Sequence, residues 1–168
     1  MTFTHQGEDG SPRMVDVSGK DVTTRSATAS GTVLLSPATV DLLRHGQAPK
    51  GDVLTVARIA AVTGAKQTAA LIPLCHPLPL HAVDVELQLV DEGVRVTVTC
   101  RTAERTGVEM EALTAVSVAG LTVIDMVKAV EREAVLTDVR IDAKSGGRSG
   151  TWSRFPQHQG AVESGDLA

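Results

Sequence analysis

Aromatic residues are nearly absent from this chain of 168 residues: Phe and Trp together make up 2%, and Tyr does not occur. The three aromatic side chains, Phe3, Trp152 and Phe155, all lie near the termini. The core between residues 4 and 151 must therefore be aliphatic, with no aromatic platform on which a base could stack. This absence argues against recognition of single-stranded nucleic acid by stacking.

Other features are scarce too, and each scarcity excludes a class of protein. Two cysteines, Cys75 and Cys100, are too few for a disulfide scaffold. No apolar run approaches the ~18 residues that a membrane helix needs, and the polar, acidic start is unlike a secretory signal or transit peptide. A net charge of -4 disfavours general binding to polyanions. We expect a cytoplasmic protein with reduced thiols, bound to neither nucleic acid nor membrane.

The composition that remains is that of one globular domain. Hydrophobic residues make up 42% and charged residues 21%, a balance that can bury a core, and this length favours one domain over two. Segments 1–13 and 156–168 are rich in Gly, Gln, Ser and acidic residues, so we expect them to be flexible. A single domain over 14–155 remains between them.

The first half of the chain predicts one strand and two helices. Small apolar residues alternate over 22–35, which is typical of a strand. Ser36 followed by Pro37 indicates a helix start, and this helix should end near Arg44. A second helix is expected over 52–66. Its apolar stripe would consist of Val53, Val56, Ile59, Ala60 and Thr63.

The second half predicts a hairpin, a long helix and a final strand. Apolar and polar residues alternate over 83–101, on either side of a turn at 91–93. The segment 106–109 fits a capping box ahead of a helix over 112–130 that is apolar nearly all round. A last strand is expected at about 134–141.

The order of these elements, β-α-(α)-β-β-α-β, predicts a ferredoxin-like α+β sandwich with an extra helix. Helices would cover one face of its sheet. The other face would carry too few charges to be solvated throughout, so we expect the chain to assemble through its sheets into an oligomer.

Two charges inside the apolar helix are the sharpest anomaly. Asp125 and Lys128 are three residues apart and therefore neighbours on the helix surface. We expect them to be buried, and buried charges need a partner or a purpose. Two interpretations stay open: a structural ion pair that closes the helix against a loop, or a general acid/base pair with shifted pKa values.

Two prolines bracket a non-helical connector that holds Cys75 and His76. A metallohydrolase site of Cys75, His76 and His81 is one alternative, although this spacing matches no strong zinc signature. Contact with a ligand, or simple packing of the loop with His76 at the surface, are the others. Farther along, Glu109 is explained as a helix-start carboxylate, whereas Glu111 is not.

Basic residues gather in the first part of this acidic chain. Seven basic residues face four acidic ones over 12–66, and the glycine-rich segment 144–150 offers backbone N–H groups and Arg148 to an anion. The combination favours a polyphosphorylated small molecule. A regulatory module that binds such a metabolite without turning it over would explain this pattern, but not Asp125 and Lys128 together.

Six segments in this order resemble one known family, the cyclic pyranopterin monophosphate synthases, also called molybdenum cofactor biosynthesis protein C or MoaC. The resemblance covers about 14–152. Its segments are MVDVS (14–18), KGDVL (50–54), IPLCHPL (72–78), TGVEMEALT (106–114), DMVKA (125–129) and KSGG (144–147).

The resemblance implies a specific reaction for a catalytic domain over 14–155. The family converts 3′,8-cyclo-7,8-dihydro-GTP into cyclic pyranopterin monophosphate, releasing pyrophosphate, in molybdenum cofactor biosynthesis; such an enzyme is a lyase. It further implies a ferredoxin-like fold in a homohexamer, a trimer of dimers, with sites between subunits. No cofactor is implied, and whether Mg²⁺ accompanies the triphosphate as a counter-ion is left open.

The resemblance also implies roles for individual residues, with no metal ligand among them. Lys50, Asp125 and Lys128 match catalytic positions that would transfer protons while the imidazole-derived ring opens and recondenses. The matched substrate-binding positions are Leu74, Cys75, His76, Met110, Glu111, Glu109, Arg25, Lys66, Arg101 and Lys144. Where the family pattern has Gly, Tyr and Cys, this chain has Ala61, Ile124 and Val127, which we interpret as packing changes.

Overall fold

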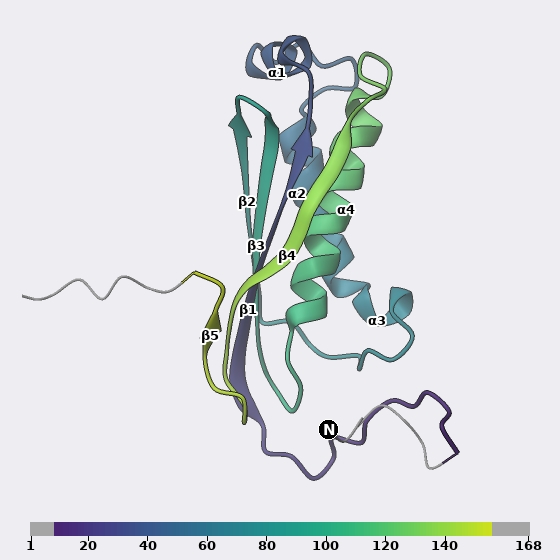
Figure 1. Cartoon of the computed structure of the whole chain (residues 1–168), viewed down its shortest axis with the longest axis vertical. Coiled ribbons are helices and arrows are strands. Elements are labelled where there is room, and N and C mark those ends of the chain that lie inside the picture. Colours follow the sequence, from purple (N-terminus) through teal and green to yellow (C-terminus); the bar gives the residue numbers. More distant parts are fainter. Residues whose placement is uncertain (1–8, 156–168) are drawn as a thin grey trace, which may run out of the picture.

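The computed structural model describes residues 9–155 as a two-layer α+β domain (Figure 1). Of the ends expected to be flexible, 1–8 and 156–168 lie outside the described residues. The elements are β1 (Thr23–Leu34), α1 (Pro37–Arg44), α2 (Val53–Lys66), α3 (Thr68–Leu71), β2 (Ala82–Val90), β3 (Gly93–Glu104), α4 (Glu109–Val127), β4 (Val135–Ser145) and β5 (Trp152–Ser153).

The strands form one antiparallel sheet in the order β2-β3-β1-β4-β5. The four long strands thus have the arrangement of a ferredoxin-like sandwich, with α2 and α4 against one face (Figure 1). The expected hairpin and the Ser36 cap of α1 are confirmed, since Ser36 Oγ accepts a hydrogen bond from Thr39 N. The short elements α3 and β5 were not expected from the sequence.

The core is aliphatic, as the scarcity of aromatic residues predicts. The largest fully buried apolar side chains are valines, and alanines fill much of the remainder. Because these side chains are small, backbones approach closely at glycines: a methyl group on Gly64 would lie 2.8 Å from Cγ2 of Val118, and one on Gly31 would lie 2.8 Å from Cγ1 of Val116. The helix layer therefore sits tightly on the sheet.

The expected apolar stripe of α2 is wrong in part. Small residues such as Ala57 and Ala61 are buried against α4, whereas Val56 and Ile59 are 40% and 63% exposed. Hydrophobicity alone favoured the larger side chains, but only small ones fit where two helices approach closely.

The long helix α4 differs from expectation at both ends. It begins at Glu109 and ends at Val127, so Val108 is its N-cap residue and no side chain caps it. The expected capping box is therefore wrong, because Thr106 lies too far ahead of the first turn. The expectation that no apolar run suffices for a membrane span is also wrong by length and composition: α4 has 19 residues with a mean hydropathy of 1.6. Half of that stretch is buried inside the fold.

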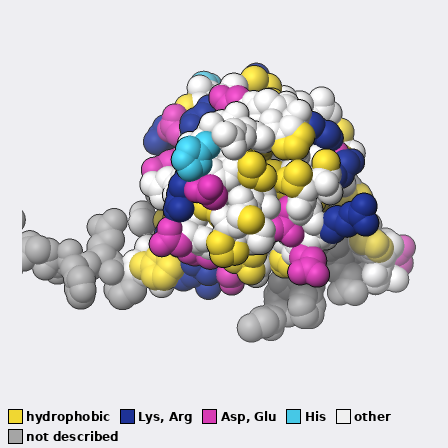
Figure 2. Space-filling view, turned by 90° about the horizontal axis from the view of Figure 1, so that it is seen from above, with side chains coloured by type: hydrophobic (Ala, Val, Ile, Leu, Met, Phe, Trp, Pro, Cys, Tyr) yellow, Lys and Arg dark blue, Asp and Glu magenta, His cyan; other side chains and the backbone are white. Residues whose placement is uncertain are grey.

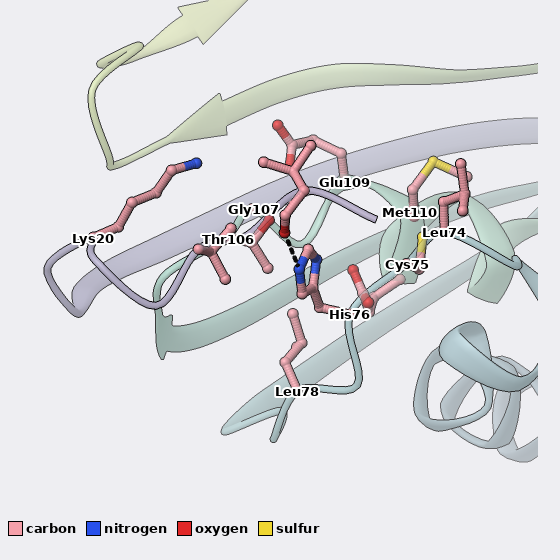
Figure 3. Close-up of a pocket in the computed structure, with 12 residues that line it drawn as sticks. Lys20, Leu74, Cys75, His76, Leu78, Thr106, Gly107, Glu109 and Met110 are labelled. Atoms are coloured by element: carbon pink, nitrogen blue, oxygen red, sulfur yellow. Dashed lines mark hydrogen bonds between the residues drawn. The ribbon is translucent and has the colours of Figure 1, made fainter. Parts of the chain in front are cut away.

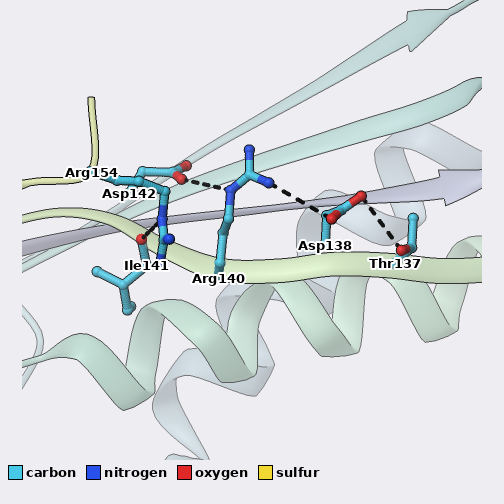
Figure 4. Close-up of polar contacts among 6 residues, drawn as sticks. All are labelled: Thr137, Asp138, Arg140, Ile141, Asp142 and Arg154. Atoms are coloured by element: carbon cyan, nitrogen blue, oxygen red, sulfur yellow. Dashed lines mark hydrogen bonds and ion pairs between the residues drawn. The ribbon is translucent and has the colours of Figure 1, made fainter. Parts of the chain in front are cut away.

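The sheet face away from the helices carries hydroxyl groups in its centre. Thr28 and Thr99 share a hydrogen bond of 2.8 Å there, and charged side chains lie toward both edges. At β4, Arg140 pairs with Asp142 at 3.2 Å and lies 3.8 Å from Asp138, whose φ of 55° marks a bulge in the strand (Figure 4). This face is polar but consists largely of small, uncharged groups.

Candidate active site

A pocket of about 300 Å³ lies at the N-terminal end of α4 (Figure 3). Three parts of the chain meet there: the N-terminal segment at Val15 and Val17, the connector after α3, and the first turn of α4. Six of the substrate-binding residues expected from the resemblance line it together, namely Leu74, Cys75, His76, Glu109, Met110 and Glu111.

His76 ties the connector to the N-terminal segment. Its Nε2 lies 2.7 Å from the carbonyl oxygen of Val15, and since a carbonyl only accepts, this ring nitrogen donates. The assignment leaves Nδ1 of a neutral His76 as an acceptor for a ligand.

Glu111 is the buried carboxyl of this pocket. It is 4% exposed, and desolvation raises its pKa above the usual value. Burial also raises the pKa of the Cys75 thiol, with a smaller contribution from the Glu111 charge. Cys75 is therefore a poor source of thiolate, whereas Glu111 can hold a proton and donate a hydrogen bond more readily than a solvated carboxyl.

Glu109 connects the pocket to the glycine-rich segment. Its Oε1 lies 2.8 Å from Nζ of Lys144, an ion pair that replaces the capping role expected of this carboxylate. Next to that segment is a second pocket, of about 670 Å³, that includes Lys20, Arg25 and Arg148. Arg25 is fixed in its wall, because Nε donates to the carbonyl of Glu104 at 2.7 Å.

A separate charge cluster lies at the C-terminal end of α4. Asp125 Oδ1 is 2.6 Å from Nζ of Lys128, and Oδ2 is 2.8 Å from Nζ of Lys50. Lys50 also donates to the Asp125 carbonyl oxygen at 3.0 Å. Hydrogen bonds from Lys128 and then Lys50 lower the pKa of Asp125 to about 2, so this carboxylate is ionised at physiological pH.

The expected burial of Asp125 and Lys128 is wrong. Their side chains are 54% and 61% exposed, because α4 ends at Val127 and both residues belong to its last turn or cap. Figure 2 views this end of the molecule, where charged side chains of both signs lie among hydrophobic ones. An exposed ion pair contributes little to stability, which weakens the interpretation of these charges as a structural clasp.

Two expected site residues lie elsewhere in the chain. Arg101 is on the outer sheet face, paired with Asp84 of the neighbouring strand. Lys66 is exposed at the end of α2. The metallohydrolase alternative is not supported either, because residues 9–155 contain no group of three His, Cys, Asp or Glu side chains able to hold a metal ion.

Lys20 was not singled out from the sequence, although it lines the pocket that holds His76. A signal was present: Lys20 lies two residues after the MVDVS segment and belongs to the basic first part of the chain. Its position could not be inferred, because the loop before β1 has no periodic pattern.

Comparison with known proteins gives one consistent result. The family model described as the MoaC family matches residues 14–147. A cyclic pyranopterin monophosphate synthase of Streptomyces griseus is 64% identical over 152 residues, covering 90% of this chain and 86% of the relative. A cyclic pyranopterin monophosphate synthase 3 of Mycobacterium tuberculosis is 53% identical, with 97% and 96% covered. A molybdenum cofactor biosynthesis bifunctional protein of Chlorobaculum tepidum is 48% identical over the whole chain, which spans 54% of that relative.

Proposed function

Because the chain belongs to the MoaC family, we infer that it is a cyclic pyranopterin monophosphate synthase of molybdenum cofactor biosynthesis. It converts 3′,8-cyclo-7,8-dihydro-GTP into cyclic pyranopterin monophosphate and pyrophosphate, a lyase reaction. The observation that supports a catalytic rather than a merely binding role is the carboxylate of Asp125 held between the ammonium groups of Lys50 and Lys128.

In this proposal, Lys50, Asp125 and Lys128 transfer the protons that ring opening and recondensation require. Asp125 keeps both ammonium groups within hydrogen-bond distance of one point. A lysine that has given its proton to a substrate nitrogen can then take one from the next group, and each such step typically contributes about 10²–10⁴-fold to the rate.

The pocket at the other end of α4 would bind the heterocycle without aromatic stacking. Glu111 and Nδ1 of His76 would form hydrogen bonds to the ring, with Leu74, Cys75 and Met110 as its apolar contacts. Arg25, Lys144 and, from the partner contacts of an oligomer, Lys66 and Arg101 would bind the triphosphate and neutralise the departing pyrophosphate. Mg²⁺ as a counter-ion of the phosphates is compatible with these roles.

The separation of the two clusters supports a site shared by two chains. Glu111 and Asp125 are 14 positions apart on α4, about 21 Å at 1.5 Å per residue, which is far more than a pterin ring spans. We therefore propose a homo-oligomer, a hexamer built as a trimer of dimers, in which one chain supplies the pocket and its neighbour the charge cluster. A hexamer has more than one kind of contact, so the open sheet faces can meet in another of them.

Incubation of the purified protein with the cyclised GTP derivative tests the proposal. We expect pyrophosphate in the medium and a pyranopterin that becomes fluorescent on oxidation. Folded protein that binds the compound but releases neither product would instead favour the regulatory-module alternative. We expect the activity in the cytoplasm, where the nucleotide-derived substrate is formed.

A further inference from the structure

We propose that Lys20 binds the α-phosphate of the substrate and so joins the two pockets at this end of the molecule into one binding site. The inference rests on the proposed function, because it assigns the part of that substrate which lies between the ring and the leaving pyrophosphate.

The position of Lys20 carries the first part of the argument. It is the one residue common to the linings of the pocket around His76 and of the pocket around Arg25. In Figure 3, its side chain extends from the loop before β1 toward the side where Glu109 lies. A ligand that occupied both pockets would have to pass this ammonium group.

The loop that bears Lys20 is fixed, but its ammonium group is not paired. Lys20 N donates to the carbonyl of Val17 at 3.0 Å, and the carbonyl of Lys20 accepts from Nε of Arg105 at 2.9 Å. By contrast, no carboxylate of residues 9–155 pairs with Nζ, whereas Lys128 and Lys144 each have one within 2.8 Å. A half-buried cation without a counter-charge favours an anion from outside the chain.

The two pockets differ in a way that orients the substrate. The pocket around His76 offers ring-sized apolar contacts and the buried carboxyl of Glu111, which would repel phosphate when ionised. The other pocket includes Arg25, Arg148 and the backbone of Gly147, with Asp21 as the one carboxylate in its lining. The ring therefore belongs in the first pocket and the terminal phosphates in the second.

Lys20 would then act where the cyclic phosphate closes. A hydroxyl oxygen of the substrate forms a bond to the α-phosphorus, and its proton passes to a basic group of the site. The bond from the α-phosphorus to the bridging oxygen breaks, and pyrophosphate leaves with that electron pair. Negative charge grows on the bridging oxygen during this step, and an ammonium group at the junction of the pockets stabilises it.

The variant Lys20→Met tests this assignment against Lys20→Arg, which keeps the charge, and Arg44→Met, which removes a cation from a distant surface ion pair. Two measurements are made: turnover of the cyclised GTP derivative, and calorimetric binding of pyrophosphate alone. We expect Lys20→Met to lower kcat/KM roughly 100-fold and to weaken pyrophosphate binding roughly tenfold, since hydrogen bonds to charged groups have this value. Lys20→Arg should recover part of both, and Arg44→Met should match the wild type.

Turnover and pyrophosphate binding by Lys20→Met at wild-type levels would overturn the assignment. If melting shows that Lys20→Met is not folded, the same comparison is made with Lys20→Gln, which keeps a polar end. A folded wild-type chain without any turnover would contradict the proposed function instead, and pyrophosphate binding then still reports on Lys20 alone.

Discussion

The two ends of α4 hold carboxylates in opposite electrostatic settings. At the N-terminal end, Glu111 is buried and desolvation raises its pKa. At the C-terminal end, Asp125 is exposed and two ammonium groups lower its pKa to about 2. One end thus provides a carboxyl that retains a proton easily, and the other a permanent anion that keeps two lysines in place.

The difference shows that the chemistry is divided between two halves of a site. A neutral or hydrogen-bonding carboxyl suits recognition of a ring, whereas a carboxylate with two ammonium groups suits movement of protons. Since one rigid helix separates them, each chain carries a complementary pair of half-sites rather than one complete site.

Loss of the charge cluster should have the largest effect. Asp125→Asn or Lys50→Ala should lower the rate of pyrophosphate release by about 10²–10⁴-fold, while circular dichroism and Tm remain near wild type because these side chains are exposed. Asp91→Asn, which breaks a similar surface pair with Arg44, is the control. Equal turnover in the three proteins would remove the distinction between the two ends.

Mixing variants tests whether the two ends belong to one site. Asp125→Asn and Glu111→Gln chains, each impaired alone, are unfolded together and refolded as a mixture. If each site takes one half from each of two chains, about a quarter of the sites should contain neither substitution, so activity should return toward that fraction. Activity no higher than the mean of the separate variants would show that each chain works alone.

A smaller effect is expected from the raised pKa of Glu111. The folded state binds this proton more tightly than the unfolded one, so the stabilisation is complete below the model value of 4.5 and is lost as pH rises through the raised pKa. Glu111→Gln, which never ionises, should therefore melt about 2–4 °C above wild type at pH 8, with the difference gone at pH 4. A constant difference across this range would mean that Glu111 is solvated like Asp125.

The smallest effect concerns the turn after α4. Glu131 is 8% exposed; its carboxylate accepts hydrogen bonds from Ser36 N at 2.9 Å and Glu133 N at 3.2 Å, which lower its pKa. Glu131→Ala should lower Tm by a few degrees near neutral pH, and by less as pH falls through the lowered pKa of this group. Glu133→Ala, a change of the same charge two residues on, should leave Tm nearly unchanged; equal shifts would deny Glu131 this capping role.

Much of the fold could be predicted because its signals are local. Strict alternation around a turn specified the β2–β3 hairpin, and Ser36 with Pro37 specified the start of α1. The buried face of α2 could not be predicted, because contact with α4 selects small residues such as Ala61 over larger apolar ones. Short elements such as β5 depend on tertiary pairing and have no pattern of their own.

The candidate site was predictable as a set of residues but not as a geometry. The resemblance indicated the pocket residues and Asp125, yet their separation depends on where α4 begins and ends. A shift of three residues in those ends changed Asp125 from an expected buried charge to an exposed one. Glu131 and Lys20 were missed because single charged residues in loops carry no periodic signal.

The close packing of α4 on the sheet makes its length a fixed dimension of the enzyme. Each added residue would advance one end by about 1.5 Å and turn it by about 100° about the axis. One insertion between Glu111 and Asp125 would thus rotate one half-site out of phase with the other, whereas seven residues would restore the phase but lengthen the helix by about 10 Å. Loops such as 91–92 can absorb insertions, but in α4 a deletion or insertion is a change of gauge for the whole assembly.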